Sequence, residues 1–283
     1  MKKTKTAVKT KKKKSVPAKP KTFTTAEQRG IDWFCAKYGG DVKAVDGNGK
    51  TLLHDAVWYN KIAVIKFLIA QGADVNAKDN HDFTPLGIGM MRKHFDAVKV
   101  LLSNGADVNV IGVMGYTPLR YAVSETEIPL EIIKILISYG ADVYEERMLS
   151  TALTYNKNIK VIKFLVSKGL DVNEKDMYDR TELHDAAYDG NVEIVKFLVS
   201  KGADVHAKDH EGKTPLHWVA GLQDEHTEYV EIVKFLISKG AKVNAKNKDG
   251  KTPLGVAKEC GNMPVVEYLE SLSSLKNTKP DNH

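Results

Sequence analysis

Apolar residues recur at helical spacing in short segments along most of the chain. Within residues 176–208, one apolar face predicts a helix from Glu182 to about Asp189, and a second face predicts a helix over residues 192–201. The residues of the second face are Val192, Ile194, Val195, Leu198 and Val199. Helices this short are not stable alone in water, so each must bury its apolar face against a neighbour.

The polar segments between these helices repeat an almost constant sequence. GADVHAKDHEGKTPLH begins at Gly202, and related copies begin at Gly72, Gly105 and Gly240. In each copy the Leu of Thr-Pro-Leu lies 14 residues after the Gly. A repeat of about 33 residues predicts an array of stacked units, each of which contacts only its neighbours.

Almost every residue of the segment at 202–217 has a structural role in such an array. Gly202 ends a helix in the left-handed conformation, and Asp209 to Gly212 have the composition of a tight turn. Thr214 caps the next helix, and Pro215 occupies its first position, where no amide donor is needed. The recurrence of the segment therefore argues against chemistry within it.

The combination of TPLHxA, two paired helices and GADVNA with a turn resembles the ankyrin repeat over roughly residues 30–273. The resemblance implies an all-α ankyrin-repeat solenoid of paired short helices plus β-hairpin turns, with about six full repeats and divergent terminal caps. It also implies a concave binding face formed by the hairpins and first helices, and a His of TPLH that ties neighbouring repeats together. We expect the ankyrin repeat domain at 24–275, a disordered Lys-rich tail at 1–23 and a disordered C-terminal tail at 276–283.

The repeat is irregular in its middle. The first helices of the units begin at Thr51, Thr84, Thr117, about Arg147, Thr181, Thr214 and Thr252. Leu149 lies only 9 residues after Gly140 rather than 14, and the sequence RMLSTA replaces TPLHxA there. This shortened hairpin predicts irregular stacking before the fourth unit. Two insertions, in SETEIPLE and GLQDEHTEYVE, predict lengthened loops between paired helices.

Positive charge is concentrated at the N-terminal end of the chain. The formal net charge is +6, from 42 basic and 36 acidic residues, and residues 1–21 hold ten Lys and no acid. The remaining 32 basic and 36 acidic residues give the rest of the chain a formal charge of −4. The tail is therefore a solvated end, a non-specific anchor for nucleic acid or anionic membrane, or a nuclear address.

Several residue types are too sparse or too widely separated to build particular sites. Arg occurs only at positions 29, 92, 120, 147 and 180, which predicts that bidentate recognition of carboxylate or phosphate does not dominate any site. Cys35 and Cys260 lie near opposite ends of the array, so no disulfide is expected. No apolar run approaches the roughly 18 residues of a membrane span, and no signal-peptide core follows the Lys-rich start. We expect a cytoplasmic monomer, with delivery into a host cell or nuclear entry through the tail as alternatives.

Motifs that suggest chemistry are better explained by the repeat. A relaxed phosphate-loop pattern ending in Gly-Lys-Thr occurs three times in the same register, each time at a hairpin before a short helix. Three His share one repeat position, which favours a structural role: His54, His184 and His217. His206 and His210 lie on two sides of a hairpin rather than on one helix face, which disfavours a metal pair. We expect no cofactor, no metal and no enzyme activity.

Function in a repeat protein resides in the positions that differ between copies. At the hairpin tips and on the first helices, these positions carry aromatic residues, Met and Arg, which are enriched at interface hot spots. We predict that the following residues bind a partner protein: Trp58, Tyr59, Phe83, Met91, Arg92, Tyr116, Tyr121, Tyr178, Tyr188 and Trp218. Packing between neighbouring repeats is the alternative for single residues, and it explains Tyr121 and Trp218 equally well.

The sequence thus predicts a non-catalytic protein–protein interaction module that binds a partner protein on the concave face of an ankyrin array. The alternative is a nucleic-acid- or anionic-surface-associated protein tethered by the basic N-terminal tail, as in a host-directed effector.

Overall fold

The computed structural model describes residues 23–37, 41–112, 115–223 and 227–277. The chain divides into two compact units, residues 1–106 (unit 1) and 107–283 (unit 2). Every regular element of the described residues is helical, and an isolated β-bridge joins Val45 to Thr51. The all-α class predicted from the repeat is therefore confirmed. Residues 1–22 and 278–283 of the predicted tails lie outside the described residues, whereas residues 276–277 of the predicted C-terminal tail are helical.

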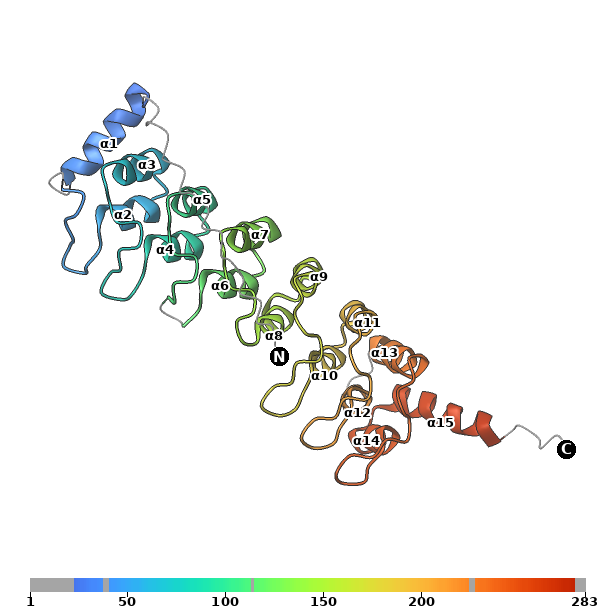
Figure 1. Cartoon of the computed structure of the whole chain (residues 1–283). Helices are drawn as coiled ribbons and strands as arrows, with labels where there is room; N and C mark the ends of the chain where they lie inside the picture. Colours follow the sequence, from blue (N-terminus) through green and yellow to red (C-terminus); the bar gives the residue numbers. More distant parts are fainter. Residues whose placement is uncertain (1–22, 38–40, 113–114, 224–226, 278–283) are drawn as a thin grey trace, which may run out of the picture. The chain divides into compact units, whose positions relative to one another are not determined.

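Unit 1 is one helix followed by two helix pairs (Figure 1). Its described helices are α1 (Thr25–Lys37), α2 (Leu52–Trp58), α3 (Ile62–Ala70), α4 (Pro85–Met91) and α5 (Phe95–Ser103). In the pairs, α2 packs on α3 and α4 packs on α5. Between the pairs, α2 contacts α4 and α3 contacts α5, so first and second helices form separate layers. The helix α1 covers α3, as expected of half a repeat that caps the stack.

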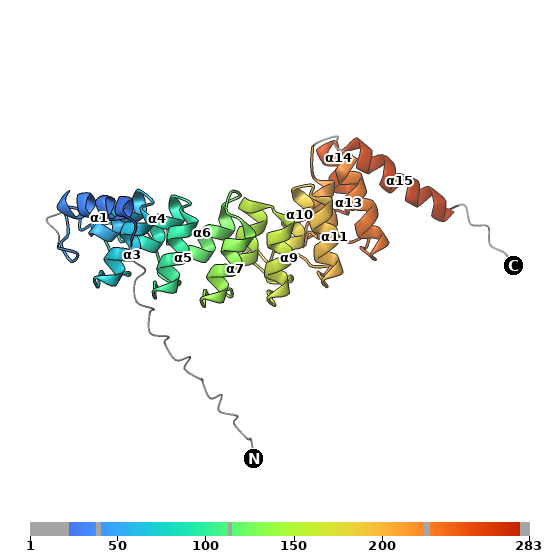
Figure 2. The ribbon, with the colours of Figure 1, turned by 90° about the horizontal axis from the view of Figure 1, so that it is seen from above.

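Unit 2 contains helix pairs of the same kind (Figures 1 and 2). Its described helices are α6 (Pro118–Ser124), α7 (Leu130–Ser138), α8 (Met148–Thr151), the π-helix η1 (Ala152–Asn156), α9 (Ile159–Ser167), α10 (Glu182–Tyr188), α11 (Val192–Ser200), α12 (Pro215–Ala220), α13 (Thr227–Ser238), α14 (Pro253–Cys260) and α15 (Met263–Asn277). The first helices α10, α12 and α14 pack side by side, and the second helices α11, α13 and α15 form the other layer. The last helix continues to Asn277, past the domain end expected at 275.

The hydrophobic core lies between the layers and between successive pairs. The Leu of Thr-Pro-Leu is at most 1% exposed in six units, at positions 53, 86, 119, 149, 183 and 216. In the last unit the equivalent Leu254 is only half-buried. A Leu at this position is thus buried by the following repeat as well as by its own repeat. The array rather than the single repeat is therefore stable.

Each pair is joined to the next by a finger, defined as the segment between a second helix and the following first helix. The Asp that opens the finger tip folds it: one carboxylate oxygen of Asp209 accepts the amides of Glu211 at 2.9 Å and Lys213 at 2.8 Å. The Gly212 amide donates to the Asp209 carbonyl at 2.9 Å, which closes the predicted turn. Neighbouring fingers are also linked, because the Lys248 amide donates to the Glu211 carbonyl at 2.9 Å.

The glycine at the finger tip is required most where another finger packs on it. Gly212 has φ 74°, and a Cβ there would lie 3.2 Å from the backbone nitrogen of Lys248. Gly250 has φ 75° at the equivalent tip, with no atom within 4 Å of a Cβ. We expect Gly212→Ala to lower the free energy of unfolding by about 2–3 kcal/mol and Gly250→Ala by about 1 kcal/mol. Urea denaturation of both variants checks this, and equal losses would show that contact between fingers adds nothing.

The recurrence of the His at one position of the TPLH sequence is explained by hydrogen bonds between neighbouring repeats. The Thr181 amide donates to Nδ1 of His184 at 3.1 Å, so the proton lies on Nε2, which donates to the Lys213 carbonyl of the next finger at 3.2 Å. His54 and His217 make the same bonds, to the Phe83 and Lys251 carbonyls. Burial lowers the pKa of all three His and keeps them neutral. The structural role implied by the family resemblance is confirmed.

The fourth pair of the chain departs from this geometry, as the shortened finger predicts. Arg147 stands where other units have the capping Thr, adopts the left-handed conformation at φ 61° and makes no side-chain cap. The first helix is broken into α8, of 4 residues, and the π-helix η1. The finger is too short to bring a capping residue to the usual place, so Arg147 is held in a backbone conformation that is costly for a non-glycine residue.

Candidate partner-binding surface

In unit 1, the structure brings together two of the predicted residues. The guanidinium carbon of Arg92 lies 4.5 Å from the Trp58 ring centroid, and Nζ of Lys50 lies 5.5 Å from it. Tyr59 and Met91 are exposed at the ends of α2 and α4. Phe83 is half-buried. Cations over the indole face form a partly exposed patch that combines an aromatic and a positive surface.

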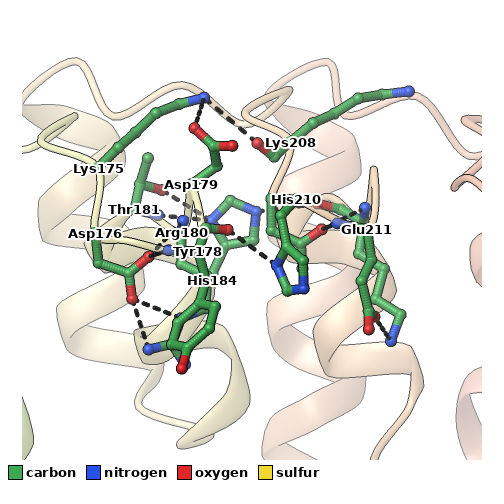
Figure 3. A network of polar contacts seen from close by, with 12 residues as sticks. Lys175, Asp176, Tyr178, Asp179, Arg180, Thr181, His184, Lys208, His210 and Glu211 are labelled. Atoms are coloured by element: carbon green, nitrogen blue, oxygen red, sulfur yellow. Dashed lines mark hydrogen bonds and ion pairs between the residues drawn. The ribbon is translucent and has the colours of Figure 1, made fainter.

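In unit 2, three of the predicted residues lie around Arg180, a residue that was not predicted. Tyr188 and Trp218 are in edge-to-face contact, with ring centroids 5.7 Å apart. The guanidinium carbon of Arg180 lies 5.3 Å from the Tyr178 ring centroid and 5.7 Å from that of Trp218. The indole nitrogen of Trp218 donates to Asp209 at 2.9 Å, so this ring is fixed by the finger. Figure 3 shows the finger side chains, including Tyr178 and His210, whose ring centroids lie 5.5 Å apart.

A cavity of about 710 Å³ opens beside these rings, within unit 2. We call it the arginine pocket, because three of the five Arg of the chain line it: Arg120, Arg147 and Arg180. Lys157, Asp185 and Asp189 complete its charged lining, and Tyr116, Tyr155, Tyr188 and Trp218 are its aromatic residues. Of the predicted unit 2 residues, Tyr121 and Tyr178 lie outside this lining.

The charges of the pocket are only partly paired. Arg180 forms ion pairs with Asp176 at 2.6 Å and Asp185 at 3.6 Å. Lys157 pairs with Asp189 at 2.7 Å. Arg120 instead donates to the Glu146 carbonyl at 2.7 Å and lies over Tyr116, and Arg147 donates to the Ser150 hydroxyl at 3.4 Å.

Arg120 and Arg147 therefore have no carboxylate within ion-pair distance among the described residues. Both guanidinium groups are positioned by neutral acceptors, and the charge of Arg147 acts on the carboxyl groups of Asp185 and Glu182 without forming an ion pair with either.

Burial shifts the pKa of two carboxyl groups beside the pocket. Glu182 is 9% exposed, and burial together with the nearby charge of Asp185 raises its pKa to about 8. One carboxyl oxygen of Glu182 has no hydrogen-bond partner. Burial also raises the pKa of Asp185, and Arg180 opposes that shift. At neutral pH Glu182 is uncharged, so it does not neutralise the neighbouring Arg147.

The expectation that bidentate recognition by Arg does not dominate any site stays a prediction, but it did not anticipate that the Arg side chains would gather. Rarity of Arg in the composition says nothing about clustering, and the fold gathers three of the five at one cavity. The signal was in the repeat register: Arg120 replaces the His of TPLH, Arg147 replaces the Thr and Glu182 replaces the Pro in consecutive units. These departures from the common sequence mark the pocket.

The phosphate-loop and histidine motifs of the sequence form hydrogen bonds within the fold. Amides of the finger at 207–214, which would have to surround a phosphate, donate to Asp209. The His210 imidazole nitrogen Nδ1 lies 3.2 Å from the Tyr178 carbonyl. No group of three or more His, Cys, Asp or Glu suited to a metal ion occurs in the described part of the chain. Cys35 and Cys260 are free thiols, as expected. Among the described helices, none has the length and apolar character to cross a membrane.

The fold defines a class of protein, an array of stacked helix pairs that are joined by fingers. A family model of ankyrin repeats in three copies matches residues 25–112, 80–147, 129–209 and 183–279. The chain therefore belongs to the ankyrin repeat family.

Two solved structures illustrate the likeness. The human ASB11 ankyrin repeat domain is 27% identical, with a TM-score of 0.60, covering 74% of this chain and 92% of that domain. The ankyrin repeat domain of Bcl-3, described as a unique member of the IkappaB protein family, is 22% identical with a TM-score of 0.62, covering 74% of this chain and 95% of that one. The second likeness concerns the fold alone. No curated protein matches the sequence significantly.

Proposed function

We propose that this protein is a non-catalytic interaction module that binds a partner protein on the concave face of its ankyrin array. Ankyrin repeats generally serve as protein–protein interaction modules. The observation that carries the proposal is the cluster of Tyr188, Trp218 and Arg180, in which partly exposed rings are held by mutual contacts. Rigid aromatic anchors and Arg supply most of the binding energy at protein interfaces.

The repeat register supports the same kind of surface in unit 1 and in unit 2. Trp58, Met91 and Tyr188 all stand four residues after the His position of TPLH in their units. Phe83, Tyr116 and Arg180 all stand immediately before the Thr position. Side chains at equivalent positions of a repeat point in equivalent directions, so the two sets form two rows within their units. Tyr59, Arg92, Tyr121, Tyr178 and Trp218 complete the proposed surface.

The proposal also covers the residue range of the binding domain, its oligomeric state and its cellular compartment. We place the binding domain at 24–275, acting as a monomer in the cytoplasm, and the free thiols of Cys35 and Cys260 agree with a reducing compartment. The second candidate function, tethering to nucleic acid or an anionic surface, is favoured only by the ten Lys of residues 1–21.

Partner capture tests the concave surface. The tagged full chain is crosslinked in lysate beside Trp58→Ala, Tyr188→Ala and a control, Tyr139→Ala, whose side chain is 48% exposed at the end of the second helix α7. We expect each of the first two variants to lose about tenfold or more of the captured partner, because an interface anchor is worth 1–2 kcal/mol or more. The control should retain it, with quantitative mass spectrometry as the measurement.

Equal capture by all four proteins would contradict the concave assignment. A chain without residues 1–21 is included in the same series. If only this deletion loses the partner, and the loss depends steeply on salt, the tethering function replaces the proposed one.

A further inference from the structure

We propose that the arginine pocket receives an anionic side chain of a partner peptide, carboxylate or phosphate, through Arg120 and Arg147. The inference rests on the proposed function and adds the chemistry of one subsite to it. Both sources of the anion present two or more acceptor oxygens, which match the fixed donor fork of a guanidinium.

The first argument is the unused donor capacity of the two guanidiniums. Each carries five N–H donors, and the structure occupies few of them: Arg120 donates to the Glu146 carbonyl, and Arg147 donates to Ser150 at the long distance of 3.4 Å. Arg180, by contrast, is bound to Asp176 and Asp185. The Arg120 guanidinium is bonded to the backbone carbonyl of Glu146, and the side chains of Arg120 and Arg147 line the same cavity. Two cations in one cavity that form no ion pair favour an anion there.

The second argument is the local backbone. Arg147 is held at φ 61°, without the side-chain cap that Thr provides at this position in most other units. Such a conformation is unfavourable for a residue with a side chain, and it persists where surrounding structure or function requires it. In the shortened finger, Arg147 stands at the position of the helix cap, and its side chain lines the cavity instead of capping the helix.

The third argument selects a peptide over a nucleic acid. Asp185 and Asp189 in the pocket wall pair with Arg180 and Lys157, so only Arg120 and Arg147 remain for an anion, too few for a chain of phosphates. Leu153, Ala186 and Ile194 add apolar surface, which suits the aliphatic neighbours of an acidic residue. A nucleic-acid site needs a positive track along several phosphates, whereas this site is one cavity with opposite charges at its edge.

Fluorescent peptide pools test the inference on the full chain. Four octapeptide pools with random uncharged flanks carry Glu, phosphoserine, Gln or Lys at the fixed central position, and binding is followed by fluorescence anisotropy. We expect the Glu or the phosphoserine pool to bind about tenfold or more tightly than the Gln and Lys pools. The tighter of the two identifies carboxylate or phosphate as the source.

Charge-removing variants locate the binding. Arg147→Gln and Arg120→Gln should each reduce the affinity for the preferred pool about tenfold, whereas Arg29→Gln, an exposed position on α1, should leave it unchanged. Any binding through the Lys-rich residues 1–21 is common to all these proteins, so the contrast between positions 147 and 29 isolates the pocket. Circular dichroism confirms that the variants are folded.

Four results would overturn the inference. The first is a Gln pool that binds as tightly as both anionic pools, and the second is an Arg147→Gln variant that keeps full affinity. The third is a labelled single-stranded oligothymidylate that competes with the peptides and is lost with Arg147→Gln. The fourth is a partner protein that Tyr188→Ala no longer captures but Arg147→Gln still captures. This result overturns the arginine pocket as a binding site and leaves the proposed function intact.

Discussion

His184→Ala is expected to lower the free energy of unfolding by about 3 kcal/mol. The side chain is 0% exposed, and it joins its own unit to the next through the Thr181 amide and the Lys213 carbonyl. Alanine leaves both backbone groups buried without a partner and opens a cavity, and each effect costs 1–3 kcal/mol. It also removes the edge contact of the imidazole with Trp218, so the fluorescence of the folded protein should change.

Urea denaturation followed by Trp fluorescence, together with hydrogen exchange of residues 181–215, measures this loss. His206→Ala is the matched control, because His206 is exposed on the finger that carries Lys213 and should change the stability by no more than about 0.5 kcal/mol. If the two variants unfold at the same urea concentration, the imidazole does not tie the units together, and its place in TPLH needs another explanation.

The repeated elements of the fold were predictable because the same residue types recur at the same positions in each repeat. The left-handed Gly after the second helix, the Asp at the finger tip and the Thr-Pro at the next helix each satisfy a local backbone requirement. Local requirements are visible in sequence, and repetition at fixed spacing removes alternatives such as a phosphate loop. The break at Arg147 was also visible, since a finger of 9 rather than 14 residues cannot place a capping Thr.

The arginine pocket was not predictable in the same way. Arg120, Arg147 and Arg180 belong to three consecutive units, and their meeting depends on side-chain directions that spacing alone does not give. Composition gave no sign of the cluster, because five Arg scattered over 283 residues do not indicate which of them meet in the fold. The aromatic positions were chosen by exposure expected from the repeat, but the Asp209 bond that fixes Trp218 depends on tertiary geometry.

The burial of Glu182 was also not predictable from the sequence, since Glu is ordinarily a surface residue. It takes the first helical position that Pro occupies in several other units, and packing in unit 2 buries its carboxyl group. Most charged groups that face it are acidic, so a negative charge on Glu182 would be poorly compensated. These neighbours are Asp185, Arg147, Glu174 and Asp176, of which only Arg147 favours ionisation.

The pKa of about 8 for Glu182 makes the stability of the protein depend on pH in a definite direction. In the folded state Glu182 keeps its proton up to about pH 8, whereas in the unfolded chain it loses the proton near the ordinary glutamate pKa of 4.5. Between these values unfolding releases a proton, so the free energy of unfolding falls as pH rises. Low pH therefore favours the folded state as far as this group is concerned.

Glu182→Gln is expected to abolish this dependence. Relative to the natural protein, the variant should gain on the order of 3 kcal/mol of stability between pH 5 and pH 8, because the amide stays neutral and has a similar shape. Urea denaturation of both proteins at pH 5, 6, 7 and 8 gives the difference, in which the titration of the three buried His cancels. Glu193→Gln, at an exposed ion pair with Lys163, should show a flat difference. A flat difference for Glu182→Gln as well would mean that Arg147 keeps this carboxylate ionised, and the positive charge of the arginine pocket would then be partly neutralised from within.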